Sequence, residues 1–247
     1  MKVLLLLLAC WSSSALQPRS RRALVADVLG GAATIALGGR AAVAAAAPPT
    51  PPERSALVAA IAGGNDDAVV AAIRALEPLD PCRAASRSVR EAALDGEWVL
   101  RWGSNTRAFS PLLAGPVKPR STQLIGSAAA RDLGEAGRIA QVLDFGGLAR
   151  VELSSGATTA DGREITIRPP FRVDAVVGGR RVSLVDADSD ASFRETNART
   201  AEAQKAGANL YVQTYLEATG APGDLRISTI TAGDPVIVGT MFVHERI

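Results

Sequence analysis

Histidine and cysteine are nearly absent from this chain of 247 residues, which has one histidine and two cysteines. A structural zinc site needs about four such ligands, so a zinc site of this kind and a disulfide scaffold are both excluded. A Ser-His-Asp or Cys-His mechanism would depend on His244, three residues from the end of the sequence. We therefore expect no enzyme activity, no catalytic residues, no metal and no cofactor.

Aromatic residues and a net charge of either sign are also scarce. Lys and Arg number 27 and Asp and Glu number 25, so the net charge is only +2. This balance gives no electrostatic reason to expect a nucleic acid as partner. Hydrophobic residues make up 47% of the chain and aromatic residues 4%, which is typical of a globular protein. The composition favours binding over acid–base or metal chemistry.

The first fifty residues have the composition of targeting segments. Residues 1–15 have a positive start, an apolar run and small residues before a cleavage site, which predicts a signal peptide. Residues 16–52 combine an acid-free basic stretch, a second apolar run with small residues after it, and a Pro-rich linker. This order is typical of secondary plastids and predicts a plastid protein, with the thylakoid lumen as an open final destination. The alternative is an ordinary secreted protein with an Ala-rich linker.

Residues 53–94 have a helical pattern. Helix formers run from Glu53 to Ala62 and end at two glycines, and Asn65 is a good N-cap for a second helix. Val69, Ile73 and Leu76 then fall at helical spacing, which predicts a hairpin of two short helices with one apolar side.

Residues 95–247 have mostly the two-residue period of strands. Paired glycines at 178–179 indicate a hairpin turn, and no long crossover helices separate the apolar stretches. We predict roughly nine or ten antiparallel strands, closed into a barrel or folded as a sandwich. The fold class is therefore mainly β, preceded by a short helical hairpin.

Three blocks of the sequence resemble the plastid lipid-associated proteins, also called fibrillins. They are residues 94–104 (LDGEWVLRWGS), residues 215–228 (YLEATGAPGDLRIS) and residues 242–246 (FVHER). They occur in the family's order, although Trp102 replaces the usual Tyr and residues 218–222 form an insertion. The resemblance implies a lipocalin-like barrel that opens with Gly96-Glu97-Trp98. It also implies that an arginine from a late strand lies over Trp98 and closes one end of the barrel, with Arg246 preferred and Arg226 as the alternative.

An apolar stripe is the predicted ligand site. We place Leu100 and Trp102 on the same face as Trp98, where they line a lipid cavity or fill a core. Tyr215 is expected to bind a polar headgroup or a neighbouring carbonyl. Asp224 and Arg226 are expected to share a strand face and to form a structural ion pair or a turn. The predicted ligand-binding residues are Leu100, Trp102, Leu143, Tyr215, Leu225 and Phe242.

These patterns leave three functions open. The resemblance implies binding of a plastid lipid, such as a prenylquinone, a carotenoid or an acyl lipid, inside the barrel. The second is a structural coat protein on plastoglobules or thylakoid margins, attached to the lipid-droplet or membrane surface without an internal ligand. The third is an enzyme acting on a hydrophobic substrate, which needs ionisable groups inside a barrel whose predicted inner face is almost wholly apolar.

Overall fold

The computed structural model describes residues 51–106, 113, 117–129, 138–159, 161–186 and 208–247. The chain divides into two units after Ala45, and the description concerns the second unit, Ala46–Ile247. The predicted signal peptide and nearly all of the predicted transit segment lie outside the described residues. Among the helices described, none is long and apolar enough to cross a membrane.

The predicted helical hairpin is confirmed. Helix α2 spans Pro52–Gly63 and ends at Gly64, whose left-handed φ of 65° suits glycine. Helix α3 spans Asp66–Leu76, and Asn65 caps it by accepting a hydrogen bond from the Ala68 N–H at 3.0 Å. The apolar side of α3 is fully buried, as the spacing of Val69, Ile73 and Leu76 predicts.

Two short helical segments follow that the sequence patterns did not predict. A 3₁₀ turn, η1, covers Glu77–Leu79, and helix α4 covers Arg87–Leu94. The Ser86 side chain caps α4 by accepting a hydrogen bond from the Val89 N–H. Helix α4 ends directly before the first strand and places Leu94 beside Trp98, so it belongs to one end of the barrel.

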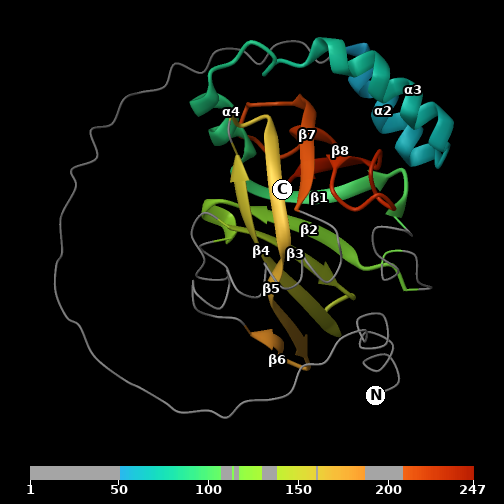
Figure 1. Ribbon diagram of the computed structural model, residues 1–247. Helices are drawn as coiled ribbons and strands as arrows, with labels where there is room; N and C mark the ends of the chain where they lie inside the picture. Colours follow the sequence, from blue (N-terminus) through green and yellow to red (C-terminus); the bar gives the residue numbers. More distant parts are fainter. Residues whose placement is uncertain (1–50, 107–112, 114–116, 130–137, 160, 187–207) are drawn as a thin grey trace, which may run out of the picture. The chain divides into compact units, whose positions relative to one another are not determined.

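Nine antiparallel strands form the described sheet, and eight of them close into a barrel, which confirms the predicted fold class. The order is β4-β3-β2-β1-β9-β8-β7-β5-β6, and an additional pairing of β4 with β5 closes the ring (Figure 1). Strand β2 was not predicted from the sequence. The strands are β1 (Gly96–Gly103), β2 (Arg120–Ile125), β3 (Arg138–Asp144), β4 (Ala149–Thr159), β5 (Glu164–Val177), β6 (Arg180–Asp186), β7 (Asn209–Leu216), β8 (Leu225–Ala232) and β9 (Met241–Arg246).

Strand β5 is long enough to serve two neighbours. Its first residues, 164–167, pair with β7 and complete the barrel, whereas residues 172–177 pair with β6. The turn between β5 and β6 contains Gly178 and Gly179, both with positive φ, as the paired glycines predicted. Strand β6 is thus an addition to the long strand rather than a member of the ring.

The helical hairpin packs against the outside of the barrel. Leu57, Val69 and Ile73 pack with side chains from β7, β8 and β9, and Figure 1 shows α2 and α3 beside this part of the sheet. Strand β8 is therefore buried on both faces over residues 225–228. This cover over the outer face decides which side chains of β8 point into the barrel.

Candidate functional site

One end of the barrel interior is built around Trp98. The ring is fully buried, and its indole N–H donates to the Leu94 carbonyl at 2.9 Å. Both arginines that the sequence offered lie over the ring, with the guanidinium carbon of Arg246 at 4.3 Å from its centroid and that of Arg226 at 5.0 Å. Two cations therefore share one aromatic partner.

Arg246 is held firmly in this end of the barrel. Its guanidinium donates to the Asp95 carbonyl at 2.6 Å and to the Ala93 carbonyl, and its Nε lies 3.5 Å from the Asp224 carboxylate. Gly96 is required next to it, because a Cβ on Gly96 would lie 2.3 Å from the guanidinium. The Gly-x-Trp start of β1 thus has a steric reason, and Arg246 has a carboxylate as counter-charge.

Asp224 pairs with Arg246 and not with Arg226, so of the two expected structural roles it is the turn that the structure shows. The Asp224 carboxylate also accepts hydrogen bonds from the Thr219 hydroxyl and from the Gly220 N–H at 2.8 Å. It therefore holds the β7–β8 turn and the end of the barrel together. The expectation of a structural role for Asp224 fits this geometry, although its partner differs.

Arg226 is a buried charged residue for which the described residues show no counter-charge. It is 2% exposed, and its guanidinium donates to the neutral Gln123 side chain on β2. Its Nε has no partner among the described residues. Burial, and then the nearby Arg246 cation, lower the pKa of Arg226 to about 9, so it remains a cation at neutral pH. An isolated buried cation of this kind is costly.

His244 faces Arg226 from the neighbouring strand, deep inside the barrel and not at its rim. The two residues are directly opposite in the β8–β9 register, and His244 is 6% exposed. Burial, and then the Arg226 cation, hold the pKa of His244 well below 6.5, so its imidazole is neutral at pH 7. Its Nδ1 is buried and has no partner among the residues described.

Further polar side chains continue along this inner face. Gln213 on β7 is opposite Ser228 on β8, both are buried, and the Gln213 Oε1 has no described partner. Tyr211 is close enough to Arg226 for each to affect the other's pKa, and burial raises the pKa of the tyrosine. The inner face of β7, β8 and β9 therefore carries a group of buried polar side chains, and the expectation of an almost wholly apolar interior is wrong.

Apolar side chains surround this polar group. Leu100 and Phe242 belong to the cluster that also contains Trp98 and Tyr211, and Leu143 belongs to a second cluster with side chains of β4 and β5. Leu143 and Phe242 are each 3% exposed. These three of the predicted ligand-binding residues lie on the inner face, as the strand registers require.

The other three predicted ligand-binding residues lie on the outer face, which corrects the sequence interpretation. A register shift between Leu100 and Trp102 places two successive side chains of β1 outside, so Trp102 does not share the face of Trp98. Its indole N–H instead donates to the Asp66 carboxylate of α3 at 2.8 Å. Leu225 and Tyr215 pack against the helical hairpin, and the Tyr215 hydroxyl donates to Glu217 at 2.8 Å.

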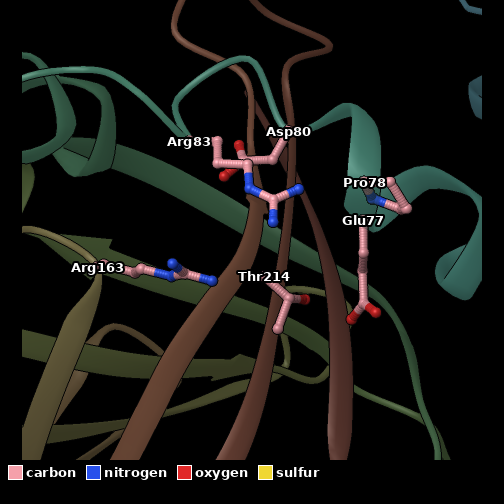
Figure 2. Close-up of a pocket in the computed structure, with 6 residues that line it drawn as sticks. All are labelled: Glu77, Pro78, Asp80, Arg83, Arg163 and Thr214. Carbon is pink, nitrogen blue, oxygen red and sulfur yellow. The ribbon is translucent and has the colours of Figure 1, made fainter.

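A second, shallow pocket lies outside the barrel between η1 and β7. Its volume is about 240 Å³, and Figure 2 shows the side chains of Arg83, Arg163 and Glu77 directed towards the space around Thr214. Thr214 is the extra residue of a bulge in β7, and its hydroxyl has no described partner. The lining mixes both signs of charge, because Asp80 and Glu77 accompany the two arginines. This pocket therefore selects no single charge.

No group of three or more His, Cys, Asp and Glu side chains that could hold a metal ion occurs in the described ranges. Comparisons of the chain with family models, with curated proteins and with solved structures find no match. The site therefore has to be interpreted from its own residues, which are the polar inner face of β7–β9 and the apolar side chains beside it.

Proposed function

We propose that this protein binds a small hydrophobic lipid inside its barrel. The observation that carries the proposal is the inner face of β7–β9, where the Arg226 Nε, the His244 Nδ1 and the Gln213 Oε1 lie buried without described partners beside apolar side chains. Buried polar atoms almost always have a partner. Because these atoms have none among the described residues, they support the presence of a bound molecule. An amphipathic ligand has both an apolar body and a polar end to satisfy such a site.

The binding mechanism follows from these surfaces. Apolar ligand surface that leaves water for the interior contributes roughly 25 cal/mol per Å². Leu100, Leu143 and Phe242 supply inner apolar surface, and the polar atoms beside them set the orientation of the ligand. Candidate ligands are prenylquinones, carotenoids and acyl lipids. The proposal is binding and carriage, without a chemical step.

The proposal includes a plastid location and membership of the plastid lipid-associated proteins. The predicted targeting segments and the three sequence blocks support it. N-terminal sequencing of the mature protein should then give a start between Ala44 and Glu53, whereas a start at Leu16 would contradict passage into the lumen.

The alternative is a coat protein on plastoglobules or thylakoid margins, and one observation favours it. Leu148 in the β3–β4 turn, and Val177 and Val182 on either side of the β5–β6 turn, are each more than half exposed. Ala149 is opposite Val177 in the sheet, so these turns lie side by side. Exposed apolar side chains at one place are typical of a surface that contacts a membrane.

Lipid extraction from the protein purified from its own plastid, followed by mass spectrometry, tests the proposal directly. A stoichiometric lipid supports internal binding. Leu143→Arg should abolish it, because the variant puts a further, unpaired positive charge into the interior, while Leu148→Arg is the matched control at an exposed leucine. Both variants must keep the circular dichroism of the parent protein. Absence of any lipid, with retained flotation on liposomes that Leu148→Arg removes, would favour the coat protein instead.

A further inference from the structure

The charges at the closed end of the barrel do not balance. Two buried cations, Arg226 and Arg246, lie over Trp98, and one carboxylate, that of Asp224, pairs with Arg246. The structure shows no carboxylate paired with Arg226 in any described segment, where Gln123 is its hydrogen-bonding partner. Burying a charge is tolerated when the charge is paired, so one negative charge is missing here.

The atoms without partners lie on one surface. Arg226 is opposite His244 in the β8–β9 register, and Gln213 is opposite Ser228, the next inward residue of β8. Directly opposite side chains start about 5 Å apart and diagonal ones about 7–8 Å apart. The Arg226 Nε, the His244 Nδ1 and the Gln213 Oε1 therefore belong to one site.

The chemistry of these atoms selects the polar end of the ligand. The Arg226 Nε is a donor, the neutral imidazole of His244 can donate through one nitrogen, and the Gln213 amide donates after a half-turn of its end group. A planar group that accepts several hydrogen bonds and carries one negative charge matches a guanidinium best, and a carboxylate is such a group. A phosphate monoester would bring more than one negative charge to a single unpaired cation.

The surroundings select the remainder of the ligand. Leu100 and Phe242 flank the polar atoms on the inner face, and Ile230 and Tyr211 continue the same apolar cluster. A hydrocarbon chain attached to the carboxylate would add apolar contacts to this cluster, in which Phe242 already contacts the Tyr211 ring, whereas a small polar acid would add none.

We propose that the barrel interior binds a long-chain monocarboxylic acid, with its carboxylate on Arg226 and its hydrocarbon chain along Leu100 and Phe242. The inference rests on the proposed lipid-binding function and narrows it. Carotenoids and prenylquinones carry no negative charge, so the acid is favoured over both.

Three ligands of equal chain length test whether a negative charge on the ligand strengthens binding. Oleic acid, oleyl alcohol and methyl oleate are titrated into the mature protein at pH 7.5 and low salt, and binding is followed by calorimetry. Oleate should bind about 10- to 100-fold more tightly than the two neutral compounds, as expected for a charge-assisted pair. Equal affinities would overturn the carboxylate assignment and leave the lipid-binding function standing. Failure of all three, and of a prenylquinone and a carotenoid, would overturn the function itself.

Variants of Arg226 test whether this residue causes the preference for oleate over the neutral compounds. Arg226→Gln should lower the affinity for oleate to that for oleyl alcohol measured on the same variant, while Arg226→Lys should keep part of the preference for oleate. Arg101→Gln is the matched control, because Arg101 belongs to the outer face of β1 and pairs with Glu245 at 2.7 Å. Unchanged oleate affinity in a folded Arg226→Gln variant would overturn the assignment. If that variant does not fold, the comparison of oleate with oleyl alcohol on the parent protein decides whether the carboxylate assignment holds.

Discussion

Two parts of the barrel bury their outer faces by different means. On β8 and β9 the outer side chains Leu225, Ile227 and Val243 are covered by the apolar side of the helical hairpin. On β4 and β5 the outer side chains Glu152 and Asp174 are 4% and 2% exposed, and Arg181 of β6 contacts both carboxylates at 2.6 Å. We call the first the hairpin-covered sector and the second the ion-paired sector.

The difference teaches which interactions each sector depends on. The hairpin-covered sector gains the burial of apolar surface, which is non-directional and roughly proportional to area. The ion-paired sector has to recover the cost of removing charges from water through close and well-oriented contacts, to which Arg150 and Arg172 also contribute. The stability of the ion-paired sector therefore depends on individual charged residues, whereas that of the hairpin-covered sector depends on how closely its apolar side chains pack.

The largest effect is expected in the hairpin-covered sector. Ile73→Ala should lower the free energy of unfolding by about 2–5 kcal/mol, because Ile73 is fully buried between α3 and the sheet. Urea denaturation followed by circular dichroism measures the loss. Val58→Ala on α2 is the control, since Val58 is 47% exposed and its truncation should cost less than about 0.5 kcal/mol. Equal effects of the two substitutions would show that the hairpin does not pack as described.

A smaller loss is expected in the ion-paired sector. Arg181→Met keeps most of the apolar stem but removes the cation shared by Glu152 and Asp174. Because the Arg181 side chain is 44% exposed, we expect a loss of only about 1–2 kcal/mol in the free energy of unfolding. The control is Arg87→Met, which removes an exposed pair with Glu91 on α4 and should cost about 0.3–0.5 kcal/mol. If the two losses were equal, the burial of the carboxylates would have no energetic consequence.

The hairpin-covered sector also shows how far the sequence could predict the fold. Helical spacing and the Asn65 cap are local signals, and they predicted both helices correctly. The paired glycines predicted the β5–β6 turn, and the two-residue period predicted antiparallel strands in a barrel or a sandwich, of which the structure shows the barrel. Strand β2 and helix α4 were missed. Helix α4 owes its place to contacts between residues far apart in the sequence, such as the hydrogen bonds from Arg90 to the Asp161 carbonyl and from Arg246 to the Ala93 carbonyl.

The candidate site was predicted less well, for a physical reason. Alternation along β8 shows that its two faces differ, but it does not show which face points inwards. The usual assumption places apolar residues inside, and it fails here because the hairpin supplies a second apolar surface on the outside. Leu225 therefore faces the helices and Arg226 faces the interior. The bulge after Leu100 places Trp102 on the outer face, opposite to the predicted face, and no residue type in β1 indicated the bulge.

The smallest expected effect distinguishes the inner face of the hairpin-covered sector from its apolar outer face. His244 is held neutral in the folded protein, with a pKa well below 6.5, because it is buried beside the Arg226 cation. In the unfolded chain its pKa is about 6.5, so below that pH the unfolded state takes up a proton that the folded state does not. Stability from this residue is therefore complete above pH 6.5 and is lost as the pH falls.

Lowering the pH from 7.5 to 5.5 should cost about 1 kcal/mol through His244, which urea denaturation at the two pH values measures. His244→Gln is the matched variant, because the chain has no other histidine and the difference between the two proteins isolates this group. The variant should lose about 1 kcal/mol less than the parent over the same interval. Equal losses would place His244 in contact with water or with an anion that stabilises its protonated form. That result, obtained on protein freed of lipid, would mean that the polar inner face is hydrated and that its unpaired atoms do not require a ligand.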